Sequence, residues 1–150
     1  MSNKKIQKQY LDNGFGFTVQ IQDAPLKKVR GEWVLTLNFE KYEKAVLIAL
    51  SLKPARLTGS EVKFIRNHFG LNLKAFGKRF GDVAHSAVIK WEKSGDDSTN
   101  MNWACEKDIR LFVINELKPK LLRIAYSNLE KVAPSKTSKI KIDSSDLLAA

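Results

Sequence analysis

Two glycines, Gly77 and Gly81, constrain the fold of this chain most, because they lie within and between two short helical patterns over residues 73–80 and 84–93. Two helices that cross closely need a small residue where they meet, and Gly77 supplies one. The turn between them needs a residue that accepts a positive φ, as Gly81 does. The sequence therefore predicts two short helices that are joined by a tight turn and cross at a steep angle.

A further helix is predicted directly before this pair. The segment from Thr58 to Glu61 has the form of a capping box, in which each of these two side chains accepts a hydrogen bond from the backbone N–H of the other residue. An apolar stripe at helical spacing follows: Val62, Ile65 and Phe69. Gly70 then predicts a left-handed end to this helix.

The two faces of the helix pair differ in chemistry. Val88 and Trp91 lie one turn apart and are predicted to be core residues rather than a platform for base stacking. The outward positions are basic: Lys74, Lys78, Arg79, Lys90 and Lys93. Between Lys53 and Lys93 there are nine Lys and Arg against three Asp and Glu, a local net charge of +6. Such a surface favours phosphate groups as the partner.

These strings resemble the Cro/repressor-like family of helix-turn-helix regulators, also called XRE-type. The likeness covers residues 58–117 and is carried by the strings 71–77, 80–81 and 83–93, the last of which ends Lys-Trp-Glu-Lys. The resemblance implies a DNA-binding fold whose third helix, over residues 84–93, lies in the major groove.

The chain departs from the family pattern at two positions. Asp82 lengthens the turn by one residue, which changes the register of the helix that follows. Leu73 stands where the family commonly has a polar residue, although Asn72 beside it can cap the helix and contact a phosphate.

The resemblance also implies which residues contact DNA. The base-reading positions are the early, outward residues of the third helix: His85, Ser86, Ala87 and Lys90. Lys90 can donate to guanine, Ser86 can serve either kind of partner and Ala87 can contact a thymine methyl group. The phosphate-binding positions are Asn72, Lys74, Lys78, Arg79 and Lys93. For His85 the alternative is a surface histidine without a role.

The rest of the chain carries weaker patterns. Alternating apolar residues predict a β-hairpin over residues 15–37: Phe15, Phe17, Val19 and Ile21, then Trp33, Leu35 and Leu37. Helical spacing predicts a helix over 39–52, another over 101–117 and a continuing stripe over 121–132.

The predicted fold class is mostly α with a small N-terminal β-hairpin, in which a helix-turn-helix domain is followed by trailing helices. The chain divides into a flexible N-terminus, a hairpin-and-helix appendage, the DNA-binding domain with its C-terminal helices, and a flexible tail: residues 1–14, 15–55, 56–132 and 133–150.

Composition narrows the class of partner. The chain has 150 residues, a formal net charge of +10 and a pI near 9.7, which favours an anionic partner, and nucleic acid before membrane. Cys105 is the single cysteine, and the two histidines have no metal-ligand spacing to it. No nucleophile with an adjacent base is visible, and the apolar runs are short. We expect a cytoplasmic protein that is not an enzyme, with no cofactor, metal or membrane partner.

The expected function is sequence-specific binding of double-stranded DNA by a transcription regulator, most simply a homodimeric repressor. Two alternatives remain open. The order of elements resembles antitoxin regulators of toxin–antitoxin operons, which implies a toxin protein as a further partner. The basic surface also suits an RNA-binding module, in which the aromatic residues Phe15, Phe17 and Trp33 would stack on bases.

Overall fold

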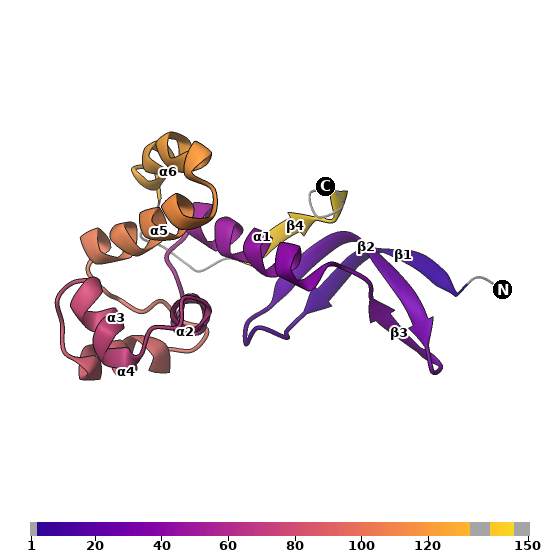
Figure 1. Ribbon diagram of the computed structural model, residues 1–150, viewed down its shortest axis with the longest axis horizontal. Coiled ribbons are helices and arrows are strands. Elements are labelled where there is room, and N and C mark those ends of the chain that lie inside the picture. Colours follow the sequence, from indigo (N-terminus) through magenta and orange to yellow (C-terminus); the bar gives the residue numbers. More distant parts are fainter. Residues whose placement is uncertain (1–2, 133–138, 146–150) are drawn as a thin grey trace.

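The computed structural model describes residues 3–132 and 139–145 and consists of a sheet at one end and a group of helices at the other (Figure 1). In chain order the elements are β1 (Lys4–Asp12), β2 (Val19–Val29), β3 (Glu32–Leu35), α1 (Phe39–Leu52), α2 (Gly59–His68), α3 (Leu73–Arg79), α4 (His85–Lys93), α5 (Trp103–Leu117), the 3-10 helix η1 (Pro119–Leu121), α6 (Leu122–Leu129) and β4 (Ile140–Asp143).

The sheet contains four strands of mixed direction. β1 runs antiparallel to β2 along most of its length, from the pair Asp12 and Val19 to the pair Lys4 and Lys27. β3 pairs antiparallel with the second half of β2, whereas β4 pairs parallel with the first half. The expected fold class is therefore wrong, since the chain is not mostly helical with a small hairpin.

Two of the strands were missed for physical reasons. β1 lies within the N-terminal stretch that was expected to be flexible. Nearly all of its side chains are exposed, so its sequence lacks the alternation of apolar and polar residues that predicts a half-buried strand. β4 lies within the expected flexible tail and pairs with residues more than a hundred positions earlier. Residues 133–138 and 146–150 of that tail lie outside the described residues.

The predicted hairpin over residues 15–37 is partly confirmed as β2 and β3. Arg30 and Gly31 form its turn with φ values of 51° and 84°, the left-handed conformation that tight hairpin turns require. Pro25 is a residue of β2. Its carbonyl accepts hydrogen bonds from the backbone N–H and the hydroxyl of Thr36.

The helices begin and end close to the predicted residues. At the start of α2 the capping box is confirmed: the Glu61 N–H donates to the Thr58 hydroxyl at 3.2 Å, and the Thr58 N–H donates to the Glu61 carboxylate at 2.9 Å. Gly70 has a φ of 66° just after α2. Asn72 caps α3 by accepting from the Ala75 N–H at 2.7 Å.

One buried cluster joins the sheet to the helices. α1 lies between the sheet and the other helices (Figure 1). The cluster takes fully buried side chains from each part: Val19 and Ile21 from β2, Val46 and Leu50 from α1, Val62 and Ile65 from α2, Phe80, Val88 from α4, and Ile109 and Val113 from α5. Burial of this continuous apolar surface fixes the positions of α3 and α4 relative to the other helices and the sheet.

Candidate nucleic-acid interface

The crossing of α3 and α4 is as close as the two glycines predicted. A Cβ atom on Gly77 would lie 2.6 Å from the Val83 carbonyl oxygen and 3.1 Å from a Val88 methyl group, so a larger residue would force the helices apart. Gly81 has a φ of 86°. The extra turn residue, Asp82, also adopts the left-handed conformation, with a φ of 49°, which Asp tolerates better than most residues.

Two buried side chains fix α4 to the core. Val88 is fully buried and Trp91 is 9 % exposed, which confirms the prediction that both are core residues. The N-terminus of α2 lies against the end of α4, because a Cβ on Gly59 would lie 2.4 Å from the Trp91 carbonyl oxygen. The need for a glycine at position 59 was missed, because nothing local in the sequence reveals this contact.

An ion pair also links α2 to α4. The Arg66 guanidinium donates to the Glu92 carboxylate through Nε at 2.6 Å and through a terminal nitrogen at 3.0 Å. Its other terminal nitrogen donates to the Leu71 carbonyl at 3.0 Å. Both charged side chains are largely buried, at 13 % and 11 % exposure. This two-point contact fixes the rotation of α4 as well as its position.

The predicted base-reading residues lie on the first two turns of α4. His85, Ser86 and Lys90 are exposed, whereas Ala87 is half-buried. Ser86 and Lys90 are four residues apart and therefore share one helix face. The N-cap residue, Ala84, provides no side-chain acceptor. The first N–H groups of α4 therefore lack a side-chain cap, as an anion-binding helix end would require.

All the predicted phosphate-binding residues are exposed, but they are not equivalent. Lys74 and Lys78 lie on α3, and Lys93 is the last residue of α4. Arg79 instead donates to Asp108 of α5 at 2.9 Å, and its guanidinium lies 4.6 Å from the ring centroid of Phe80. Arg79 is therefore already held against the protein.

The ion pairs reduce the positive surface that the sequence suggested. Of the nine cationic residues between Lys53 and Lys93, four form ion pairs: Lys53 with Glu61, Arg56 with Glu106, Arg66 with Glu92 and Arg79 with Asp108. Five exposed lysines remain: Lys63, Lys74, Lys78, Lys90 and Lys93. The unpaired exposed charge of this segment thus comes from lysines on α2, α3 and α4, while the arginines form ion pairs within the protein.

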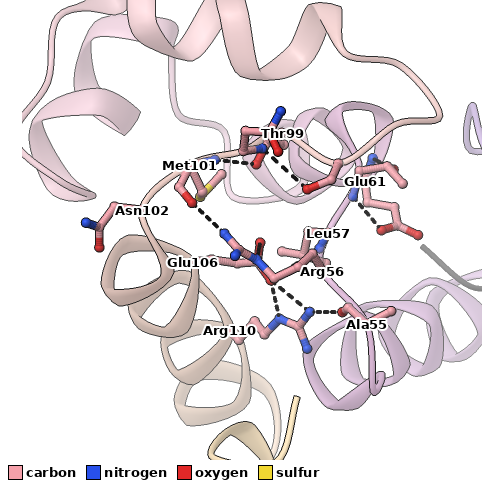
Figure 2. Close-up of polar contacts among 12 residues, drawn as sticks. Ala55, Arg56, Leu57, Glu61, Thr99, Met101, Asn102, Glu106 and Arg110 are labelled. Carbon is pink, nitrogen blue, oxygen red and sulfur yellow. Dashed lines mark hydrogen bonds and ion pairs between the residues drawn. The ribbon is translucent and has the colours of Figure 1, made fainter. Parts of the chain in front are cut away.

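A buried polar network fixes the α1–α2 linker against α5 (Figure 2). Glu106 is fully buried, and its carboxylate accepts from Arg56 at 2.8 Å, from the Leu57 N–H at 3.2 Å and from Arg110 at 2.8 Å. Arg110 also donates to the backbone carbonyls of Lys53 and Ala55. Burial lowers the pKa of Arg110 and the adjacent Glu106 opposes this shift.

Sequence reasoning missed this network. Its one local signal is the four-residue spacing of Glu106 and Arg110, which is the same as that of an ordinary surface pair on a helix. In the fold, the network joins the linker between α1 and α2 to α5.

The aromatic residues of the N-terminal part do not form an open stacking surface. Phe17 is buried, and Phe15 packs against Tyr42 and Phe64 with ring centroids 5.1 and 4.7 Å apart. The Trp33 ring is covered by the Lys5 ammonium group, 4.5 Å from its centroid. The argument that these aromatic side chains stack on RNA bases is therefore weakened.

Comparisons with family models, with curated proteins and with solved structures return no match for this chain. Within residues 3–132 and 139–145, no helix is long and apolar enough to cross a membrane. In the same part of the chain, no three His, Cys, Asp or Glu side chains form a group that could hold a metal ion.

Proposed function

We propose that this protein binds double-stranded DNA in a sequence-specific way, with α4 in the major groove. The observation that carries the proposal is the contrast between the two faces of α4. Its inner face is anchored by Val88 and Trp91, while its outer face presents His85 and Lys90 at the solvent-exposed end of a helix-turn-helix.

The chemistry of the outer face suits base edges. The Lys90 ammonium can donate to O6 and N7 of guanine, and the Ser86 hydroxyl can donate or accept. His85 lies at the first position of α4, close to its uncapped N–H groups, where it can contact a guanine or a phosphate. Ala87 offers a methyl group to thymine.

The exposed lysines other than Lys90 supply the sequence-independent part of the affinity. Lys74 and Lys78 on α3 and Lys93 at the end of α4 flank the base-reading residues. Phosphate contacts of this kind position a protein on the duplex, whereas base contacts determine which sequence it prefers. Asn72 already accepts from Ala75 through its side-chain oxygen, and its amide group remains able to donate to a phosphate.

A single recognition helix reads few base pairs, so we propose that two copies bind an inverted repeat. α6 is suited to the contact between copies, since two of its large side chains, Ile124 and Tyr126, are 54 % and 52 % exposed. By contrast, the large apolar side chains of α5 are buried or half-buried within the chain. Such a dimer would act as a transcription regulator that represses the promoter it covers.

Competition binding tests the proposal. A labelled duplex obtained by selection from random DNA would be challenged with unlabelled duplex of the same sequence, with scrambled duplex and with RNA. The proposal predicts that only the selected sequence competes efficiently, and that Lys90→Ala removes this preference while the matched variant Lys118→Ala, on the exposed end of α5, keeps it. Equal competition by RNA or by scrambled DNA would refute it.

A further inference from the structure

A second basic surface lies at the end of the sheet farthest from the helix-turn-helix. We define the basic arm as residues 4–8 of β1 together with residues 24–35, which comprise the second half of β2, β3 and the turn between them. It contains six basic residues and one acidic residue, a formal net charge of +5: Lys4, Lys5, Lys8, Lys27, Lys28 and Arg30, against Glu32. All six basic side chains are exposed.

The strand register places these charges side by side. Lys4 lies directly opposite Lys27 across the β1–β2 pair. On the other face, Lys5 and Lys28 both approach the Trp33 ring, at 4.5 and 5.9 Å from its centroid. Like charges in such positions destabilise a sheet. No ion pair among the described residues includes Lys5, Lys8, Lys27, Lys28 or Arg30.

The arm also has a groove that is lined by both basic and apolar residues. This groove has a volume of about 800 Å³ and is lined by Lys4, Lys5, Ile6, Pro25, Leu26, Lys27 and Thr36. Ile6, one of the apolar residues that line it, is 72 % exposed. A nucleic-acid strand has the matching chemistry, because its phosphates are anionic and the sugars between them are less polar. Lys4 and Lys27 lie on one face of the arm, and Lys5 and Lys28 on the other, so exposed ammonium groups are available to the phosphates of a charged polymer on both faces.

The arm lies at the opposite end of the molecule from α4. In Figure 1, α4 and the β2–β3 turn that carries Arg30 lie at opposite ends of the long axis and both lie toward the lower side of the view. A duplex that follows this axis can contact α4 at one end of the protein and the tip of the arm at the other.

We infer that the basic arm is a second DNA contact, which binds backbone phosphates beside the segment that α4 reads. This inference rests on the proposed function, because DNA is taken as the anionic ligand. The arm adds affinity and lengthens the protected segment, and it leaves the choice of sequence to α4.

The test measures binding to a duplex of ~30 base pairs, about three helical turns, at several KCl concentrations by fluorescence anisotropy. The neutral arm variant is Lys27→Gln/Lys28→Gln/Arg30→Gln. The charge-preserving variant is Lys27→Arg/Lys28→Arg. The matched control removes three exposed charges elsewhere: Lys118→Gln, Lys120→Gln and Lys131→Gln. Thermal unfolding of each variant verifies that it is folded.

The inference predicts that the neutral arm variant lowers the slope of log K against log salt by roughly two to three units, at about 0.9 per lost phosphate contact. Hydroxyl-radical footprinting should show a shorter protected segment for this variant. The charge-preserving variant and the control should bind like the parent. An unchanged slope, an equal loss in the control, or a loss seen only with single-stranded RNA or anionic phospholipid vesicles would overturn the inference.

A parallel measurement with His85→Ala/Lys90→Ala separates this inference from the proposed function. If that variant loses discrimination between sequences while the neutral arm variant binds like the parent, the arm inference fails alone. If the neutral arm variant loses salt dependence while His85→Ala/Lys90→Ala retains full discrimination, the role of α4 is refuted and the arm contact stands.

Discussion

Arg66 of α2 and Glu92 of α4 form a two-point ion pair in which two guanidinium nitrogens lie 2.6 and 3.0 Å from the two carboxylate oxygens. The pair lies next to Trp91, on the inner side of α4, and is largely shielded from solvent. The direction in which α4 presents His85 and Lys90 therefore depends on two residues that need not contact DNA themselves.

Glu92→Gln should lower the free energy of unfolding by about 1.5–3 kcal/mol, because it leaves Arg66 without its charged acceptor in a partly buried place. Urea unfolding measures this change. The matched control is Asp108→Asn, which breaks the Arg79 pair, whose side chains are both 48 % exposed, and should cost about 0–1 kcal/mol. Equal effects of the two substitutions would contradict a structural role for the Arg66–Glu92 pair.

Trp91→Ala should lower the free energy of unfolding by about 3–5 kcal/mol, since it removes a buried aromatic side chain from the contact of α4 with the core. The measurement is again urea unfolding, followed by circular dichroism. Trp33→Ala, in the basic arm, is the control and should change stability far less. If both tryptophan variants unfold at the parent's midpoint, Trp91 does not anchor α4.

The lysines and Arg79 should differ in their contribution to DNA binding. Lys78→Ala should reduce the salt slope by about one unit on any duplex sequence, as the loss of one phosphate contact does. Arg79→Ala should reduce it less, because Arg79 is engaged with Asp108 and lies over the Phe80 ring. Salt titration of the two variants measures both slopes. A larger reduction in the slope for Arg79→Ala than for Lys78→Ala would contradict the prediction.

Cys105 should react slowly in the folded protein. Burial, with smaller contributions from Asp108 and Glu106, raises the pKa of its thiol above the ordinary value. The unfolded chain then loses this proton at a lower pH than the folded chain does. The stability that the protonated Cys105 thiol contributes is therefore fully present below the ordinary thiol pKa of about 8.5. It is lost as the pH rises through the pKa of the thiol in the folded protein.

The measurement for Cys105 is the rate of modification by an aromatic disulfide reagent at mildly alkaline pH, with and without denaturant. We expect slow reaction in the native protein and fast reaction in urea. Cys105→Ala should remove the corresponding part of the pH dependence of unfolding. A native rate equal to the unfolded rate would show that the thiol is accessible.

The helices were predictable because their signals are local. The capping box of Thr58 and Glu61, the stop at Gly70 and the close approach at Gly77 each depend on the same helix or on the turn and helix next to it, and all are present in the structure. β1 was not predictable, because its exposed polar side chains have the composition of a flexible terminus.

The candidate site was predictable only in part. The exposure of His85, Ser86 and Lys90 followed from helical spacing. The ion pairs could not be predicted in this way. The sequence around a cationic residue does not show whether its side chain faces solvent or contacts a carboxylate that is distant in the chain. Arg56 and Glu106 are fifty residues apart, and only the folded chain brings them together.

The central claim is that α4 reads base edges, and selection of bound duplexes from random DNA, carried out in parallel with the parent and with His85→Ala/Lys90→Ala, tests it most directly. The account predicts that the parent enriches a defined motif. The variant should lose preference at specific positions of that motif, by about 1–3 kcal/mol for each lost contact, and still bind DNA through its remaining lysines. Enrichment of the same motif by both proteins, or of no motif by the parent, would contradict it.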